Sequence, residues 1–293
     1  MIYYLLLAGV IAFGVLETML QKSYNIRTGN RGVFLFGALS AYAAAITFLC
    51  SASFPLHYSL AALPYSIVLA LSYGSAIVGT VMAYRYGPLA ITALIASYSL
   101  LVPTFYGIIF LHETPRFTFF IGLTLLVISL FLINYRKEKN AAPFSPKWLI
   151  FMIITFCGNG LCSTVQTMFV RNVDGRDGAP SMKNEFMIVS LVIIGTILIL
   201  ASFAAERHDI GKVVGKGGLF AVGYGVLNGF LNLFVILIQV GKVIPVAVMY
   251  PCISAFGMVA TYLLSVFFYK EKMTAASRVG FYIGIAACVL LNL

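Results

Sequence analysis

Glu17 is the residue whose type and position point most directly to chemistry. It follows sixteen uncharged residues, inside the first of several apolar runs of helix length. A carboxylate in hydrocarbon costs roughly 2.5–3.5 kcal/mol on insertion scales, so such a residue usually faces a cavity or a partner. In a partly dry site it could exchange a proton near neutral pH, and a cation could compete with that proton. The alternative is that Glu17 snorkels to water at a helix end or pairs with Lys22.

Two later apolar runs carry polar side chains at helical spacing. Ser163, Gln166 and Thr167 are three and four residues apart, so they share one helix face. Tyr224, Asn228 and Asn232 recur every four residues and form a second stripe. In lipid such stripes face the inside of a helix bundle, where they either bind a solute or tie helices together.

Three tyrosines in apolar runs complete the set of candidate residues. Tyr98 precedes Pro103, and Tyr250 precedes Pro251, where a proline permits a kink that suits either a gate or plain packing. The rings could stack on a cation or form a packed aromatic core. The predicted substrate site, with Glu17 as its proton-coupling residue, comprises Glu17, Tyr73, Tyr98, Ser163, Gln166, Asn228, Asn232 and Tyr250.

The composition requires lipid as the solvent of this chain. Hydrophobic residues make up 61% of it and charged residues 10%, against about 45–50% and 25% in soluble domains. The net charge of +10 lies in short clusters between apolar runs, and no basic domain exists to bind nucleic acid. Cys157 and Cys162 have no His nearby and fit no common zinc spacing, so we expect core cysteines, no metal site and no cofactor.

The apolar runs predict an all-α membrane protein with ten transmembrane helices. A spanning helix needs about 20 apolar residues, and long continuous runs exclude a barrel of short alternating strands. Breaking the chain at charges and turn residues gives the segments 2–21, 32–52, 60–84, 87–111, 117–135, 148–170, 185–205, 217–241, 243–269 and 277–292.

The distribution of basic residues predicts the orientation. The odd-numbered loops between these segments hold fourteen Lys and Arg residues, whereas the termini and the even-numbered loops hold five. Cytoplasmic loops carry the excess of Lys and Arg. We therefore expect both termini outside a plasma (inner) membrane and the 136–147 connection in the cytoplasm.

The two halves of the chain echo each other. Gly14–Thr18 in the first segment resembles Gly160–Thr164 in the sixth, and Glu113 closes the fourth segment as Glu271 closes the ninth. Because each half would have five spans, the second half would enter the membrane in the opposite sense, as an inverted repeat. The predicted organisation is a first repeat at 1–135, a linker at 136–147 and a second repeat at 148–293.

With these features the chain resembles the drug/metabolite transporter superfamily, and within it the EamA-like ten-helix members. The motifs that carry the resemblance are Phe110–Thr114 with Gly122 and Phe268–Thr274 with Gly280, and the likeness covers essentially the whole chain. The resemblance implies secondary transport, often export, of small metabolites or drugs through a central cavity. Related four-span members use a carboxylate in their first helix for proton-coupled exchange, and Glu17 is placed similarly. Many ten-span relatives have cytoplasmic termini and a basic tail, unlike this chain.

The leading hypothesis is a secondary transporter, an antiporter for a small organic metabolite or drug-like cation. A lipid-linked substrate flippase or its accessory subunit is the alternative, and a membrane-embedded enzyme is a remote one, because His57, His112 and His208 fall at loops. No Walker A pattern is present. The expected partners are a small-molecule solute, membrane lipids and protons as coupling ion, for a monomer or homodimer.

Overall fold

The described part of the chain is built from apolar α-helices. The computed structural model describes residues 2–29, 31–86, 96–134, 145–269 and 275–292. Six described helices are long and apolar enough to cross a membrane, and four shorter ones are also apolar, so this is an integral, multi-pass membrane protein. The helices are α1 (Ile2–Thr28), α2 (Val33–Ser51), α3 (Leu63–Tyr86), α5 (Leu101–Phe110), α6 (Phe117–Asn134), α7 (Pro146–Asn172), α8 (Lys183–Ala205), α9 (Ile210–Gly241), α10 (Val246–Tyr269) and α11 (Ala275–Asn292), with 3₁₀ turns at Leu60–Ala62 and Arg176–Gly178.

The helix ends differ from the predicted segments where a charge was treated as a break. The first segment was predicted to end at residue 21, but α1 continues to Thr28. The helix stops there because Gly29 adopts a left-handed conformation, with φ of 63°, which is a common way to end a helix. Basic side chains in the last turn of a membrane helix reach the headgroup region and do not end it.

The start of α9 also differs from the prediction because charged residues were treated as a break. The predicted segments 185–205 and 217–241 leave residues 206–216 as a connection between helices. This prediction is wrong from residue 210 onward, because α9 begins at Ile210. The connection is a tight turn in which the Asp209 N–H donates to the Glu206 carbonyl at 2.8 Å. Lys212 and Lys216 therefore lie on the first two turns of a 32-residue helix.

The fourth predicted segment, 87–111, is interrupted. Residues 87–95 lie outside the described part of the chain, a helical stretch follows from 96 to 98, and α5 starts at Leu101 after a turn. The turn lies one helical turn before Pro103, where the ring of a proline would clash with a helical carbonyl. Pro251, by contrast, lies inside the continuous helix α10.

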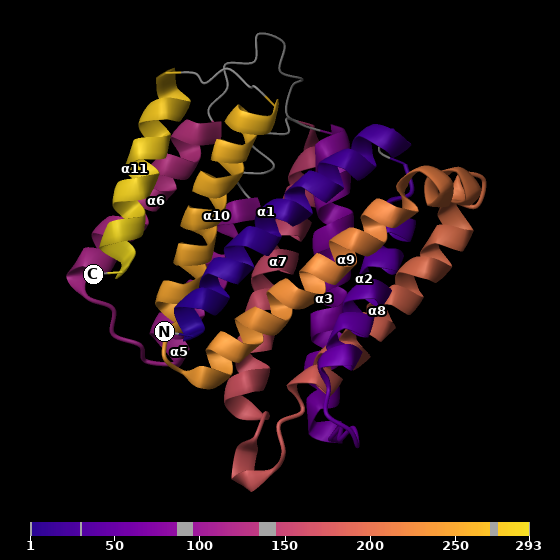
Figure 1. The fold of residues 1–293 in the computed structure, drawn as a ribbon, viewed down its shortest axis with the longest axis horizontal. Helices are drawn as coiled ribbons and strands as arrows, with labels where there is room; N and C mark the ends of the chain where they lie inside the picture. Colours follow the sequence, from indigo (N-terminus) through magenta and orange to yellow (C-terminus); the bar gives the residue numbers. More distant parts are fainter. Residues whose placement is uncertain (1, 30, 87–95, 135–144, 270–274, 293) are drawn as a thin grey trace.

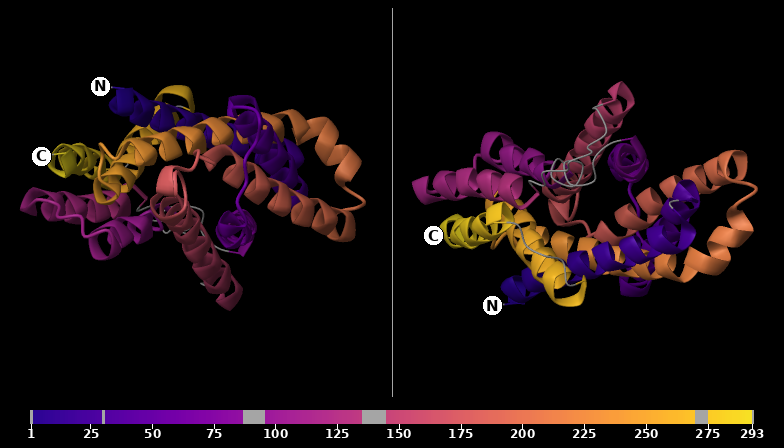
Figure 2. Two further views of the ribbon diagram at one scale, coloured as in Figure 1. Left: turned by 90° about the horizontal axis from the view of Figure 1, so that it is seen from below. Right: turned by 90° about the horizontal axis from the view of Figure 1, so that it is seen from above.

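The helices pack in pairs that join distant parts of the chain. The most extensive pairings are α1 with α9, α2 with α8, α3 with α7, and α6 with α11, while α5 packs mainly on α10. Figure 1 shows α1 and α9 running obliquely beside each other across the molecule. The views in Figure 2 show an elongated cross-section, with α6 and α11 at one end and the α8–α9 connection at the other.

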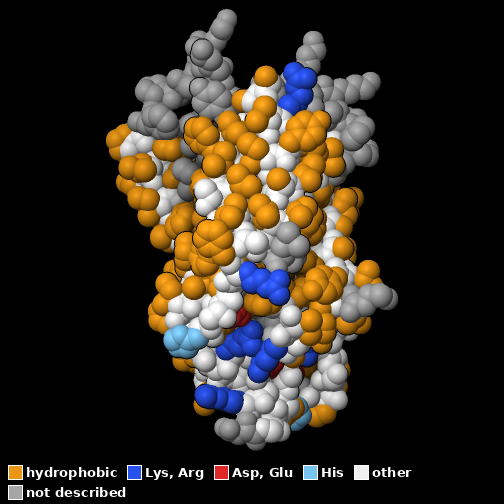
Figure 3. Space-filling model, turned by 90° about the vertical axis from the view of Figure 1, so that its left-hand side faces the viewer, with side chains coloured by type: hydrophobic (Ala, Val, Ile, Leu, Met, Phe, Trp, Pro, Cys, Tyr) orange, Lys and Arg blue, Asp and Glu red, His pale blue; other side chains and the backbone are white. Residues whose placement is uncertain are grey.

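Two buried apolar clusters meet at the C-terminal third of α9. One is formed mainly by α2, α3, α7 and α8, and the other by α1, α6, α10 and α11; α9 contributes side chains to both. The outer surface is also apolar: in Figure 3 hydrophobic side chains cover most of one face, and Lys and Arg gather mainly in its lower part. This surface matches a lipid-facing exterior.

Candidate functional site

Glu17 lies on the inner face of α1, where it is 8% exposed. One of its oxygens, Oε1, is buried and has no hydrogen-bond partner among the described residues. Its polar neighbours are the side chains of Asn228 on α9 and Tyr73 on α3, both neutral. Glu17 therefore does not snorkel to water here, and the Lys22 side chain, its other predicted partner, lies outside the described residues.

Asn228 is the centre of a polar network around Glu17. The Tyr73 hydroxyl donates to Asn228 Oδ1 at 3.1 Å. Asn232, one turn further along α9, donates through Nδ2 to the Asn228 carbonyl at 2.9 Å and to its Oδ1 at 3.1 Å. The two asparagines of the stripe predicted on this helix thus face the inside of the bundle, against α1 and α3. Tyr224, the third member of that stripe, packs instead against Phe36 of α2.

Gln166 joins α7 to this network. Its Nε2 donates to Asn232 Oδ1 at 3.1 Å and also faces Met187 Sδ of α8 at 3.5 Å. Four predicted site residues from α3, α7 and α9 are therefore connected by hydrogen bonds, with Glu17 of α1 beside them. Amide groups of this kind are costly in lipid unless they are paired, which explains their mutual hydrogen bonds.

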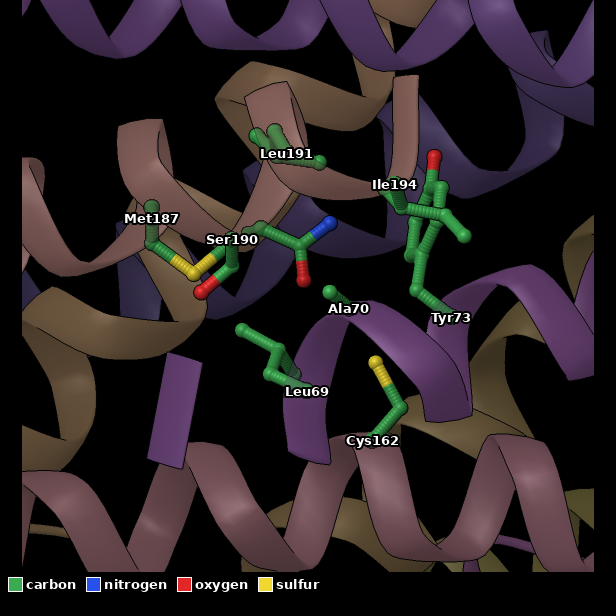
Figure 4. A pocket seen from close by; sticks show the side chains of 9 residues that line it. Leu69, Ala70, Tyr73, Cys162, Met187, Ser190, Leu191 and Ile194 are labelled. Carbon is green, nitrogen blue, oxygen red and sulfur yellow. The ribbon is translucent and has the colours of Figure 1, made fainter. Parts of the chain in front are cut away.

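A small pocket adjoins the network on the side of α8. Its volume is about 10 Å³, room for about one water molecule. Figure 4 shows side chains of α3, α7 and α8 converging on it, and Tyr73 and Asn232 connect it to the polar network. Its wall is mainly apolar, with a few polar side chains, and is formed by Leu69, Ala70, Tyr73, Cys162, Met187, Ser190, Leu191, Ile194 and Asn232.

Tyr250 and Ser163 belong to a second, separate polar cluster. The Tyr250 hydroxyl donates to the Ser163 carbonyl at 3.1 Å and lies 3.4 Å from Thr167 Oγ1. Gln239 Nε2 donates to the Tyr250 hydroxyl at 2.8 Å and to Thr167 Oγ1 at 3.2 Å. This cluster ties α10 to α7 and α9. Gln239 lies seven residues beyond Asn232 on α9, which is about 10 Å along the helix.

Tyr98 is not brought to either cluster. Its hydroxyl donates to the Val127 carbonyl of α6 at 2.7 Å, and its ring packs against the cluster formed by α6, α10 and α11. The predicted site residues are thus divided into three places: the network around Glu17, the cluster around Tyr250, and the isolated Tyr98.

Two residues in these clusters were not predicted. Gln239 was outside the predicted site, although its spacing of seven residues from Asn232 places both on one helix face. Cys162 was interpreted as a core residue; it lines the pocket and lies near the hydroxyls of both Tyr73 and Tyr250. Nothing in an apolar segment distinguishes a pocket cysteine from a packed one. Among the described residues, no three His, Cys, Asp or Glu side chains gather as they would around a metal ion.

Comparisons with known proteins bear on the fold and on one part of the chain. A family model described as Small Multidrug Resistance protein matches residues 218–283, which include Asn228, Asn232, Gln239 and Tyr250 but not Glu17. No curated protein matches. A solved structure described as "Crystal structure of protein" has 12% sequence identity and a TM-score of 0.67, over 98% of this chain and 95% of that one. At this identity the likeness concerns the fold alone.

Proposed function

We propose that the protein is a secondary transporter that moves a small organic metabolite or drug-like cation across the membrane. The observation that carries this proposal is the buried Glu17 carboxylate, which has an unpaired oxygen and neutral polar neighbours. Among the described residues no positive charge is paired with this group, and a cationic solute or a proton would supply one. The match of residues 218–283 to a multidrug resistance family agrees with a drug-like cation.

Coupling would arise because one carboxylate serves both ions. When Glu17 binds a proton, it is neutral and its burial is no longer costly, so it releases a cationic solute. When the proton leaves, the carboxylate again attracts the solute. The amides of Asn228, Asn232 and Gln166 would orient the solute.

The helix pairs support the proposed inverted repeat of ten spans, as in EamA-like proteins. In such a repeat the helices of the first half, α1, α2, α3, α5 and α6, correspond in order to α7, α8, α9, α10 and α11 of the second. The counterpart of the α1–α9 pair is then the α7–α3 pair, and both pairs have extensive contacts. The pairs α2 with α8, α5 with α10 and α6 with α11 each join two counterparts. These five pairs form the same set when the halves are exchanged, as a two-fold axis between 1–135 and 148–293 would require. A fused repeat completes a site within one chain, so a monomer suffices.

The proposal is tested by ligand binding in the purified, full-length protein. We would screen tetramethylammonium, tetraethylammonium, choline and guanidinium by thermal shift, at mildly acidic and mildly alkaline pH. A ligand at a hundred times its dissociation constant stabilises by about 2.7 kcal/mol. We expect a ligand whose thermal shift is smaller at acidic pH. In the Glu17→Gln variant, the thermal shift caused by this ligand should be small at both pH values.

Glu185→Gln is the matched control. Glu185 is also 8% exposed, but its Oε1 accepts the His57 N–H at 3.3 Å near a helix end. We expect this variant to bind the ligand as the original protein does, with the same pH dependence. Proteoliposomes should then exchange the ligand for protons only when Glu17 is present. Full, pH-dependent exchange by Glu17→Gln would refute the coupling role.

A further inference from the structure

The first turn of α10 is fastened to three other helices. At its end, Tyr250 is 2% exposed, and its hydroxyl bonds to Ser163 of α7 and receives a hydrogen bond from Gln239 of α9. Thr167 and Gln239 on the two facing helices are 0% and 1% exposed. A polar group buried this deeply among helices holds them together, because separating them would leave it without partners.

The start of the same turn accepts a cap from a carboxylate in the connection between α5 and α6. Glu113, just beyond the end of α5, accepts the N–H of Val246 at 3.0 Å and that of Ala247 at 2.7 Å. A carboxylate at a helix N-terminus pairs with otherwise free N–H groups and with the positive end of the helix dipole. Arg171 at the end of α7 lies 3.9 Å from Glu113 Oε1.

Close backbone approach completes this attachment. A Cβ on Gly107 of α5 would lie 2.8 Å from Glu113 Oε2 and 2.9 Å from the Ala247 nitrogen. Only glycine therefore allows α5 to lie this close to the capped helix start. Figure 1 shows α5, the end of α9 and the start of α10 together at the lower edge of the molecule.

Proline separates this turn from the rest of its helix. Pro251 directly follows Tyr250 and has no N–H, so the Ala247 carbonyl receives no helical hydrogen bond from it. The segment from Val246 to Tyr250 therefore lacks one of the hydrogen bonds that would join it to the remainder of α10, and the helix can bend at the proline.

We propose that this first turn is a gate, fastened by Tyr250 and Glu113, that closes the candidate site toward the loops 111–116 and 242–245. Cys162 lies between the two polar clusters: it lines the pocket and directly precedes Ser163, whose carbonyl accepts a hydrogen bond from the Tyr250 hydroxyl. Release of Tyr250 from α7 and α9 would open the pocket from this end. The inference rests on the proposed transport function, since a gate implies a pathway, but its test uses neither transport nor Glu17.

The test measures how fast N-ethylmaleimide labels Cys162, by mass spectrometry of the purified protein in lipid nanodiscs. In the original protein, Cys162 should label more slowly than Cys50, which is exposed at the end of α2. Tyr250→Phe and Glu113→Gln should each raise the labelling rate of Cys162 by about five- to tenfold, as expected from the loss of one buried hydrogen bond. Labelling of Cys50 should not change.

Tyr42→Phe is the matched control, because it removes a hydroxyl that lies 3.0 Å from Thr196 Oγ1, away from α10. Thr167→Val, which weakens the cluster from the α7 side, replaces Tyr250→Phe if that variant does not fold. A melting temperature close to that of the original protein separates gate opening from loss of structure. Unchanged Cys162 labelling in the folded gate variants, or an equal rise in Tyr42→Phe, would overturn the proposal.

Discussion

Glu17 differs from Glu185, another buried acid, in what surrounds its carboxylate. Both are 8% exposed. Glu185 lies in the first turn of α8 and accepts a backbone N–H, as acids at helix starts commonly do. Glu17 lies within a spanning helix and keeps an oxygen unpaired. A carboxylate oxygen that is buried at this cost without a partner among the described residues is better explained by a bound ion than by packing.

At the same scale, Tyr73 should affect ligand binding more than folding. Tyr73→Phe removes one hydrogen bond to Asn228 Oδ1, but that oxygen still accepts from Asn232. No buried acceptor is therefore left unpaired, and we expect the melting temperature to stay within about 2 °C. Without the hydroxyl, Asn228 is less well oriented toward Glu17, and the ligand found by the screen should bind about three- to tenfold more weakly.

Isothermal titration of the folded variant checks this prediction. Tyr58→Phe serves as its control, since the Tyr58 hydroxyl lies 3.0 Å from Ser66 Oγ, outside the network around Glu17. Unchanged affinity in Tyr73→Phe, or an equal loss in Tyr58→Phe, would argue against a role of Tyr73 in the site.

At the scale of helices, the site depends on close backbone contact between α2 and α9. A Cβ on Gly225 would lie 2.7 Å from the Ser40 Cα and would also meet the Ser40 carbonyl. Both obstacles are backbone atoms, which cannot rotate away, so α9 would have to move outward. The shift would carry Asn228, three residues further along, away from Tyr73.

We therefore predict that Gly225→Ala lowers stability by about 1–3 kcal/mol, the usual cost of overpacking. The change should appear in the melting temperature of the detergent-solubilised protein, together with weaker ligand binding. Gly211→Ala, at the start of the same helix, has nothing within 4 Å of the added Cβ and should be neutral or slightly stabilising. Equal effects of the two substitutions would contradict the packing argument.

The elements were more predictable than their contacts. Long apolar runs predicted the helices α2, α6 and α8 to within two residues, because lipid permits little else. Polar spacing predicted that Gln166 and Asn232 face inward, as the hydrogen bond between them confirms. Spacing along one helix could not predict that Tyr250 and Asn232 lie in different clusters, because that division depends on how helices from both halves of the chain cross.

At the scale of the molecule, the orientation is the prediction with the clearest test. The excess of Lys and Arg in the odd-numbered loops places His208 in the cytoplasm and His57 outside. Both side chains are exposed. In intact cells, a membrane-impermeant maleimide should label a His57→Cys variant directly, and label His208→Cys only after permeabilisation. The native cysteines would be replaced beforehand, and the reverse labelling pattern would invert the topology.

Because α9 is long, its orientation should depend on the thickness of the bilayer. Its apolar part, from Gly217 to Gly241, would be about 37 Å long, against a hydrocarbon thickness of about 30 Å. A helix with this mismatch tilts, and its tilt changes with the acyl chains around it. Because Asn228 and Asn232 lie on α9 and Gln166 on α7, thinner or thicker lipid would slide one side of the polar network past the other. The lipid composition of a membrane would thereby adjust how well the site is assembled.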